Sequence, residues 1–329
     1  MKILYIGPQS GNSKFHIDCL KKNSKNIDVL NIEIFFRKFR FLSLIFYNIS
    51  PKIFEIFINI YLKNRIKNQY DLIYVISAEF LGINALNFLK KKTKKIFFYF
   101  SDNPFVKRDK KRWTLFLSVV NQYDKIFFIQ QSRLKYKKKY NSNNFVIKLP
   151  PYEKKIHKKR NLKKIYDVVF VGTWLDTRGI FVNYLLKNKI NLKVFGTRWE
   201  KDRFYKINKS NIILGNLKPI EYSNIINKAK IAICLFSKEN EDNITTRSSE
   251  IPAIGTFMLS YKSNYQKKIL RDKKEVVYFN NFNDCVQKCH FYLKETNVRK
   301  KIASQGMHKI REKLNISYED LIKDILRNV

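Results

Sequence analysis

Short apolar runs alternate with longer polar or amphipathic stretches along the first half of the chain. The first run, residues 2–6, stops at the sequence Gly-Pro-Gln-Ser-Gly and is followed by a helical pattern from about residue 13. Runs of this length that end in turn residues are typical of strands buried on both faces, and the stretches between them are long enough for crossover helices. The pattern predicts a doubly wound parallel sheet whose further strands are residues 71–76, 95–100 and 125–129.

A second series of the same kind follows a change of composition at Leu149, Pro150 and Pro151, where a lysine-rich hydrophilic stretch begins. Three of its strands end at glycine, and helical segments such as residues 221–228 separate them, while the tail from residue 282 is largely helical. The strands of this series are expected at residues 166–172, 192–196, 211–215, 231–236 and 256–260.

Two domains are expected from this pattern, because single cores stop growing at about 250 to 300 residues and this chain has 329. We predict an α/β protein in which two doubly wound, Rossmann-like domains face each other across a cleft, with ligands at the carboxyl ends of the strands. The predicted parts are an N-terminal domain (1–150), a linker (151–165), a C-terminal domain (166–315) and a terminal helix (316–329) that packs back on the N-terminal domain.

The most apolar stretch, residues 41–62, is interrupted by polar and charged residues well short of the roughly 20 residues that a membrane-spanning helix needs. Two interpretations remain open for it. Helical spacing favours a helix packed on the sheet through Ile53, Phe54, Phe57, Ile58 and Tyr61. The basic flanks and aromatic content instead favour a face that rests on a membrane surface, with Arg37, Lys38, Arg40, Lys63, Arg65 and Lys67 beside Phe41, Leu42, Leu44, Ile45, Phe46 and Tyr47.

The composition adds a strong basic excess, since 66 Lys and Arg against 27 Asp and Glu give a formal net charge of +39. Abundant Lys, Ile, Asn, Phe and Tyr are expected from an AT-rich coding background, which explains the lysines but not the shortage of acids. Both halves share the excess, whereas a nucleic-acid module usually concentrates its charge in an arm or stripe. The diffuse charge suits nucleotide phosphates and anionic lipid, and disfavours nucleic acid as the partner.

The four cysteines are scattered, and the chain opens without an apolar leader, so we expect free thiols in a reducing cytoplasm rather than a disulfide framework. Cys285 and Cys289, followed by His290, have a spacing that a metal site can use, but no second ligand pair accompanies them. Buried helical thiols are the favoured interpretation, and no metal is expected.

The most informative segment is residues 235–260, in which a strand, a polar loop and a short helix follow one another. Thr245, Thr246 and Arg247 lead into the helix, and Glu250 lies about one turn further on. A helix start with an arginine beside it suits a diphosphate, and a carboxylate one turn along can accept hydrogen bonds from ribose hydroxyls. The alternative from the residues alone is a capped surface helix with a solvated arginine.

The run TTRSSEIPAIGTFML in this segment resembles the signature of the CgeB-like (spore-maturation protein) glycosyltransferases, members of the GT-B superfamily allied to glycosyltransferase group 1. Other stretches agree with that family in order and spacing, and together they cover nearly the whole chain: MKILYIG, YFSDNPF, YDKIFFIQQS, LPPYEKKIHKK, YDVVFVGTW and the terminal helices from VYFNNF onward. The resemblance implies a GT-B fold and transfer of a sugar from a nucleotide diphosphate sugar, held by the C-terminal domain, to an acceptor held mainly by the N-terminal one.

The same resemblance implies roles for individual residues, without a metal. Group 1 enzymes commonly carry a Glu-x7-Glu pair, of which Glu250 matches the second member, while Asp242 takes the place of the first and departs from glutamate. Positive groups and helix ends would stabilise the departing diphosphate in place of a metal. The implied donor-binding residues are Gly11, Gly172, Thr173, Arg178, Arg198, Gly215, Asn216, Leu217, Thr245, Thr246, Arg247 and Glu250.

An inverting reaction needs a base that takes the proton of the acceptor hydroxyl, and His16 and Asp102 are the candidates. Both follow predicted strands of the N-terminal domain. The structural alternatives are that His16 is simply a helix residue and that Asp102 forms a turn before Asn103 and Pro104. A retaining reaction would need neither as a base.

The acceptor is expected to be a glycan, lipid-linked or other envelope molecule, with the enzyme cytoplasmic and attached peripherally to the anionic inner face of the membrane. The alternative to membrane attachment is that the positive charge only keeps the protein soluble. Two other classes stay open: a nucleic-acid-binding protein or DNA-modifying glucosyltransferase, suggested by the charge, and a binding-only GT-B relative, suggested by Asp242 in place of glutamate.

Overall fold

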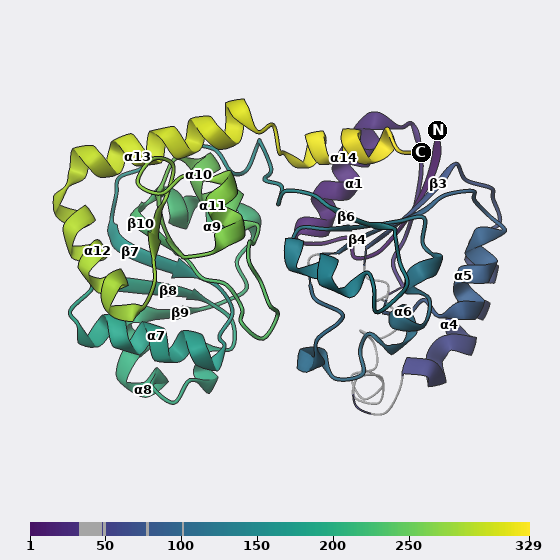
Figure 1. Cartoon of the computed structure of the whole chain (residues 1–329), viewed down its shortest axis with the longest axis horizontal. Coiled ribbons are helices and arrows are strands. Elements are labelled where there is room, and N and C mark those ends of the chain that lie inside the picture. The colour runs from purple at the N-terminus through teal and green to yellow at the C-terminus, as the bar shows by residue number, and fades with distance from the viewer. Residues whose placement is uncertain (33–47, 49–50, 77–78, 101) are drawn as a thin grey trace. The chain divides into compact units, whose positions relative to one another are not determined.

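A computed structural model, which describes residues 1–32, 48, 51–76, 79–100 and 102–329, divides the chain into two compact α/β units (Figure 1). The first unit consists of Met1–Leu149, Ser237–Asp242 and Tyr318–Val329, and the second of Pro150–Phe236 and Asn243–Ser317. The apolar run at residues 41–47 and the basic flank at 37–40, which the membrane interpretation uses, lie outside the described residues.

The first unit is built on a six-stranded parallel sheet with the order β2-β1-β3-β4-β5-β6. The four predicted strands are confirmed to within one residue at each end, whereas β2 and β6 were missed. Both missed strands are edge strands. The strand β2 is polar and half-exposed, and β6 is apolar but has only three residues, so neither shows a long continuous apolar run. The bounds are β1 (Lys2–Ile6), β2 (Asn26–Leu30), β3 (Leu72–Ile76), β4 (Ile96–Phe100), β5 (Lys125–Phe128) and β6 (Phe145–Ile147).

Helices cover both faces of this sheet. Apolar side chains of α4 (Glu55–Arg65), α5 (Ile83–Lys90) and α6 (Thr114–Ser118) pack with one set of alternate strand residues. On the other face α1 (Asn12–Asn23) packs against α14 (Tyr318–Leu326), so the end of the chain completes the first unit.

The predicted helix at residues 53–61 is present, but one of its assigned contacts is wrong. Phe54 and Ile58 are buried as expected, together with Leu62. Phe57 is 57% exposed, and Ile56 and Ile60 also face solvent, because α4 turns that side away from the sheet. None of the described helices is long and apolar enough to cross a membrane.

The second unit contains another six-stranded parallel sheet, with the order β12-β11-β10-β7-β8-β9. All five predicted strands are present, although β10 begins and ends two residues earlier than expected. The three-residue edge strand β12 was missed. The bounds are β7 (Tyr166–Val171), β8 (Leu192–Gly196), β9 (Ile212–Leu214), β10 (Ala229–Cys234), β11 (Phe257–Tyr261) and β12 (Val277–Phe279).

The helices of the second unit again lie in two layers (Figure 1). Side chains of α7 (Asp176–Lys187) and α12 (Phe282–Lys294) pack on one face, and those of α9 (Pro219–Asn227) and α10 (Arg247–Ile254) on the other. The remaining helices are α8 (Tyr205–Asn208), α11 (Asn264–Ile269) and α13 (Thr296–His308). The four cysteines are buried free thiols, as predicted.

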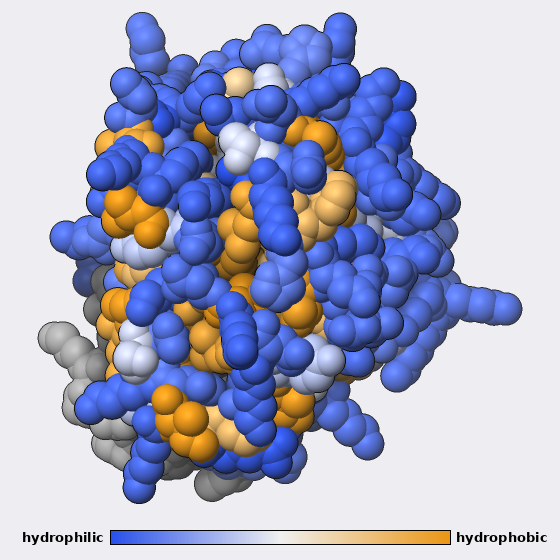
Figure 2. Space-filling view, turned by 90° about the vertical axis from the view of Figure 1, so that its left-hand side faces the viewer, coloured by the Kyte–Doolittle hydropathy of each residue, from blue (hydrophilic) through white to orange (hydrophobic). Residues whose placement is uncertain are grey.

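The outer surface of this unit is strongly hydrophilic. Figure 2 shows it covered mainly by hydrophilic side chains, with hydrophobic groups scattered between them. Scattered exposed apolar side chains are normal on a folded protein.

His16 lies in a buried aromatic cluster between α1 and the first sheet. Its Nδ1 is 2.9 Å from the hydroxyl of Tyr74, and the rings of Tyr99 and Tyr318 lie 4.6 and 5.0 Å from its own. Because burial disfavours the charged imidazolium, the pKa of His16 is lowered from 6.5 to about 3. The neutral ring is thus part of the packing of α1.

This burial predicts a pH dependence of the first unit's stability. The pKa of His16 is lower in the folded protein than in the unfolded chain, so the stabilisation is present above pH 6.5 and is lost as the pH falls toward the folded value. Between pH 7 and 5 the loss is about 2 kcal/mol. Urea unfolding of wild type and His16→Gln, whose side chain stays neutral, measures it.

The wild type should lose about 2 kcal/mol more than His16→Gln over this pH range. His157, whose pKa is also lowered by burial, is present in both proteins and cancels in the comparison. Equal losses in the two proteins would contradict the assignment.

Candidate functional site

The carboxyl ends of β7 and β10 mark the point where the strand order of the second sheet reverses. From β7 the chain proceeds to β8 on one side, and from β10 it proceeds to β11 on the other. Ligands of doubly wound sheets bind outside the carboxyl ends of the strands at such a point. Gly172 and Thr173 directly follow β7, and Thr245, Thr246 and Arg247 lead from β10 into α10.

The turn after β7 is tied closely to the end of β8. Gly172 donates its N–H to Phe195 O (2.9 Å), and the indole Nε1 of Trp199 donates to Gly172 O (2.8 Å). Gly196 has a φ of 153°, and a Cβ at this position would lie 2.1 Å from Gly172 O. Glycine is therefore required at 196, because only a bare Cα lets the two strand ends approach.

Arg178 and Arg198, both predicted to bind the donor, differ from each other in burial and contacts. The guanidinium of Arg178, in the first turn of α7, donates to Thr173 O (2.8 Å) and lies 5.6 Å from the centre of the Phe170 ring. Arg178 is 8% exposed, so it supports the turn from within. Arg198 follows β8 in a left-handed conformation (φ 66°) and is exposed, which leaves its guanidinium open to a ligand.

The predicted base-contacting segment lies at the end of β9. Gly215 donates its N–H to Gly196 O (3.0 Å), which links it to the same set of strand ends. Gly215 and Asn216 are exposed, and Leu217 packs against the core. A Cβ at Gly215 would meet no atom within 4 Å. The surface at the end of β9 is therefore accessible to a planar group.

Arg247 begins α10 with a donor that the protein does not use. Its Nη2 donates to Leu235 O (3.2 Å), which holds the side chain against the end of β10. Its Nε is buried and has no hydrogen-bond partner among the described residues. Thr246 occupies the N-cap position without a side-chain hydrogen bond to the helix, and Thr245 N donates to Ser248 Oγ (3.3 Å). An unpaired buried donor at a helix start is a place where an anion stabilises the structure.

Glu250 lies one turn further along α10 and is 5% exposed. Burial, and then the charge of Glu250, raises the pKa of the Tyr222 hydroxyl. Burial lowers the pKa of His157, whose ring lies 5.8 Å from that of Tyr222, and the charge of Glu250 opposes this change. The sequence interpretation missed Tyr222 and His157 as neighbours of this carboxylate, although Tyr222 lies in a predicted helix and His157 in the stretch LPPYEKKIHKK that carried part of the resemblance.

Four of the predicted site residues lie in the first unit, among them Gly11, His16 and Asp102. Gly11 precedes α1 with a φ of 59° and is exposed. His16 is 2% exposed, so an acceptor hydroxyl has no open approach to it. The Asp102 carboxylate is 41% exposed and forms an ion pair with Arg108 (3.2 Å). Of the two candidate bases, the geometry favours Asp102.

Asp242, the fourth, is held by a buried arginine that the sequence interpretation missed. Its Oδ1 accepts hydrogen bonds from Arg133 Nη2 (3.3 Å), Asn240 Nδ2 (2.6 Å) and Gln130 Nε2 (3.3 Å). Arg133 is fully buried, and burial lowers its pKa while the charge of Asp242 opposes the change. These contacts anchor Ser237–Asp242 in the first unit, and a catalytic role for Asp242 stays a prediction.

No group of three or more His, Cys, Asp or Glu side chains among the described residues is arranged to hold a metal ion. What the carboxyl edge of the second sheet offers an anion is backbone N–H groups and the guanidinium groups of Arg198 and Arg247.

The close approach at Gly196 predicts a sharp difference between two glycine substitutions. Gly196→Ala places its Cβ against Gly172 O, so we expect a loss of about 2–4 kcal/mol in the stability of the second unit. Gly215→Ala is the matched control, because its Cβ enters open space, and should change stability by less than about 1 kcal/mol. Thermal unfolding measures both, and equal midpoints would show that the strand ends need not approach.

Comparison with known proteins places this geometry in context. Residues 178–326 match the model of a family described as glycosyl transferase-like. No curated protein matches the chain. Anabaena HepE, solved in complex with UDP-glucose, has a TM-score of 0.71 at 11% identity over 100% of both chains.

Two other solved structures share the fold. Sucrose-phosphate synthase from Thermosynechococcus elongatus has a TM-score of 0.72 at 10% identity, over 100% of this chain and 98% of the other. TarM, of which S. aureus variants are also solved, has a TM-score of 0.62 at 14% identity, over 82% of this chain, which spans 57% of the length of TarM. The two Rossmann-like units form the GT-B fold, as the resemblance implied. The family match over residues 178–326 and the shared fold together support a glycosyltransferase.

Proposed function

We propose that the enzyme transfers a sugar from a nucleotide diphosphate sugar to a hydroxyl group of a glycan, lipid-linked or other envelope acceptor. The observation that carries this proposal is the buried, unpaired Nε of Arg247 at the start of α10, beside the switch point of the second sheet. A diphosphate there would accept a charge-assisted hydrogen bond from this donor and would lie at the positive end of the helix dipole.

The surrounding residues supply the other contacts of a donor. Glu250 would accept hydrogen bonds from the ribose, and the exposed backbone of Gly215 and Asn216 would face the base. As the bond from the anomeric carbon to the diphosphate breaks, negative charge grows on the leaving oxygen, and Arg247 and Arg198 would stabilise it. The enzyme would therefore work without a metal ion.

In an inverting reaction the acceptor oxygen forms the new bond to the anomeric carbon and gives its proton to a base. We assign that base to Asp102 in preference to His16, because the Asp102 carboxylate is exposed and His16 is enclosed by aromatic rings. The narrower CgeB-like assignment belongs to the same proposal and rests on the run from Thr245 to Leu259.

Calorimetry with UDP, GDP and their sugars tests donor binding, and the complexes of HepE with UDP-glucose and UDP make uridine nucleotides the first choice. Removal of a charged hydrogen-bond acceptor costs about 1.5–3 kcal/mol, so Glu250→Ala should weaken binding at least about tenfold. Glu312→Ala is the control and should bind as wild type, because Glu312 is an exposed carboxylate in the π-helical turn Lys309–Lys313 that follows α13.

Absence of binding by folded wild type to every nucleotide would overturn the proposal. Binding without hydrolysis or transfer in an acceptor screen would favour the binding-only alternative. Binding and turnover should survive EDTA, and loss of turnover on chelation would contradict metal independence.

We further propose that the enzyme attaches peripherally to an anionic cytoplasmic membrane face, where a lipid-linked acceptor would reside. The support is the exposed apolar side of α4, formed by Ile56, Phe57 and Ile60, with Lys63 and Arg65 on the same helix. Each Lys or Arg near such a surface contributes about 1 kcal/mol, and the effect fades within about 8 Å at physiological salt.

Sedimentation with phosphatidylglycerol and neutral vesicles tests this attachment. Wild type should bind the anionic vesicles at low salt and release them at high salt. Ile56→Ser/Phe57→Ser/Ile60→Ser should bind several-fold less, while the control Ile207→Ser/Ile213→Ser/Phe291→Ser, which changes exposed residues of the second unit, should bind as wild type. Equal, negligible binding of wild type to both lipids would refute attachment and leave the donor assignment intact.

A further inference from the structure

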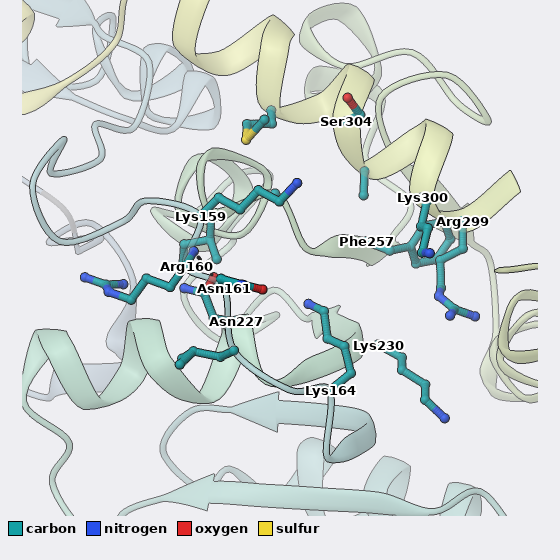
Figure 3. A pocket seen from close by; sticks show the side chains of 15 residues that line it. Lys159, Arg160, Asn161, Lys164, Asn227, Lys230, Phe257, Arg299, Lys300 and Ser304 are labelled. Carbon is teal, nitrogen blue, oxygen red and sulfur yellow. Dashed lines mark hydrogen bonds between the residues drawn. The ribbon is translucent and has the colours of Figure 1, made fainter. Parts of the chain in front are cut away.

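A cationic pocket lies in the second unit, at the edge of the sheet opposite to the predicted donor site. It is a cavity of about 760 Å³ between the linker, the starts of β10 and β11, and α13 (Figure 3). Lys164 precedes β7, Lys230 is the second residue of β10, and Phe257 is the first residue of β11. These are the amino ends of strands whose carboxyl ends carry Gly172 and Arg247, and six residues of strand separate the two edges by about 20 Å.

The lining of this pocket is unusually one-sided in charge. Of its fifteen lining residues six are Lys or Arg, and none of them is Asp or Glu. The basic residues are Lys159, Arg160, Lys164, Lys230, Arg299 and Lys300. The volume falls within the range of small-molecule sites, about 300–1,000 Å³. The pocket thus has the size and the sign of charge of an anion site.

Three of these cations are already used by the protein. Arg160 donates to Ser223 Oγ (2.7 Å), Lys230 forms an ion pair with Asp167 (2.7 Å), and Arg299 donates to the last carbonyls of α12, including Leu293 O (3.0 Å). These contacts fix part of the positive rim in place. They also show that the cations are not there merely as solvated side chains.

The side chains of the other three, Lys159, Lys164 and Lys300, have no hydrogen-bond or ion-pair partner among the described residues, and all three residues are exposed to solvent. In Figure 3 the Lys164 side chain extends toward the middle of the pocket, with Lys159 and Lys300 on other parts of its wall. Partial burial, and then the charges of Arg299 and Lys159, lower the pKa of Lys164 to about 8. An anion in the pocket would remove this repulsion, because it offers the opposite charge at the same place.

Elsewhere in the second unit, Lys and Arg side chains form ion pairs with a nearby Asp or Glu. Lys288 pairs with Asp284 (2.7 Å), and Arg271 with Glu275 (2.7 Å). The hollow on the neighbouring part of α13, about 620 Å³, is lined by that same Arg271–Glu275 pair and is therefore partly neutralised. In the pocket around Lys164, Asp167 pairs with Lys230 from outside the lining, whereas no Asp or Glu among the described lining residues lies beside Lys159, Lys164 and Lys300.

We propose that this pocket binds a phosphate-bearing ligand through Lys159, Lys164 and Lys300, at a site separate from that of the sugar donor. Phosphate is the favoured anion because several separate ammonium groups suit its multiple charged oxygens. Apolar side chains complete the wall and would contact the uncharged part of the ligand: Leu162, Ile254, Phe257, Ala303 and Met307. The ligand is either a soluble phosphate compound or the headgroup of a phospholipid, and both present the same group to these lysines.

Binding of inorganic pyrophosphate, measured by calorimetry at low salt, tests the soluble source. Vesicles of phosphatidylcholine with phosphatidic acid, measured by sedimentation, test the lipid source. The pocket variant is Lys159→Gln/Lys164→Gln/Lys300→Gln. The matched control, Lys187→Gln/Lys201→Gln/Lys206→Gln, removes the same charge from exposed positions elsewhere in the second unit. Arg247→Ala shows whether a probe binds at the predicted donor site instead of in the pocket.

We expect at least one probe to bind wild type, the control and Arg247→Ala alike, and to bind the pocket variant at least tenfold more weakly. Weaker binding of pyrophosphate by the pocket variant identifies a soluble ligand. Weaker binding of the vesicles alone identifies a lipid headgroup. Three outcomes would overturn the proposal: no binding of either probe to wild type, equal binding by the pocket variant and the control, or loss in Arg247→Ala alone. An unchanged thermal midpoint of the pocket variant shows that it is folded.

Discussion

The pairing of β7 with β10 is the contact on which the second unit depends. Parallel strands need crossover connections, and the crossovers from these two strands run in opposite directions, to β8 and to β11. The loops that leave their carboxyl ends therefore diverge. Three features assigned to the donor site follow from this divergence: the turn at Gly172, the start of α10 and the unpaired Nε of Arg247.

Much of this fold can be read from the sequence, because central parallel strands are buried on both faces and appear as unbroken apolar runs. The edge strands β2, β6 and β12 have one neighbour each and are short or polar, so they leave no such run. Phe57 shows a related limit. Helical spacing identifies a face, but which of two apolar faces meets the sheet is decided by packing that the spacing does not contain.

The candidate site, like the fold, could be predicted from the sequence only in part. Glycines and the Thr-Thr-Arg run occupy loop positions that the order of strands determines, so the sequence could place them. The contacts of Arg133 with Asp242, and of Glu250 with Tyr222 and His157, join side chains that are far apart in the chain. A pattern of residue types carries no record of such pairs. The assignment of Ser237–Asp242 to the first unit was missed for the same reason.

The division of the units along the chain has a consequence for synthesis on the ribosome. The first unit lacks α14 until residues 318–329 have been made, because these residues belong to it while nearly all of the second unit is encoded before them. At about 5–20 residues per second, α1 waits about 15–60 s for its partner helix. During that time the apolar side of α1 is uncovered. We therefore expect nascent chains to need protection by a chaperone, and fragments cut at Pro150 to aggregate.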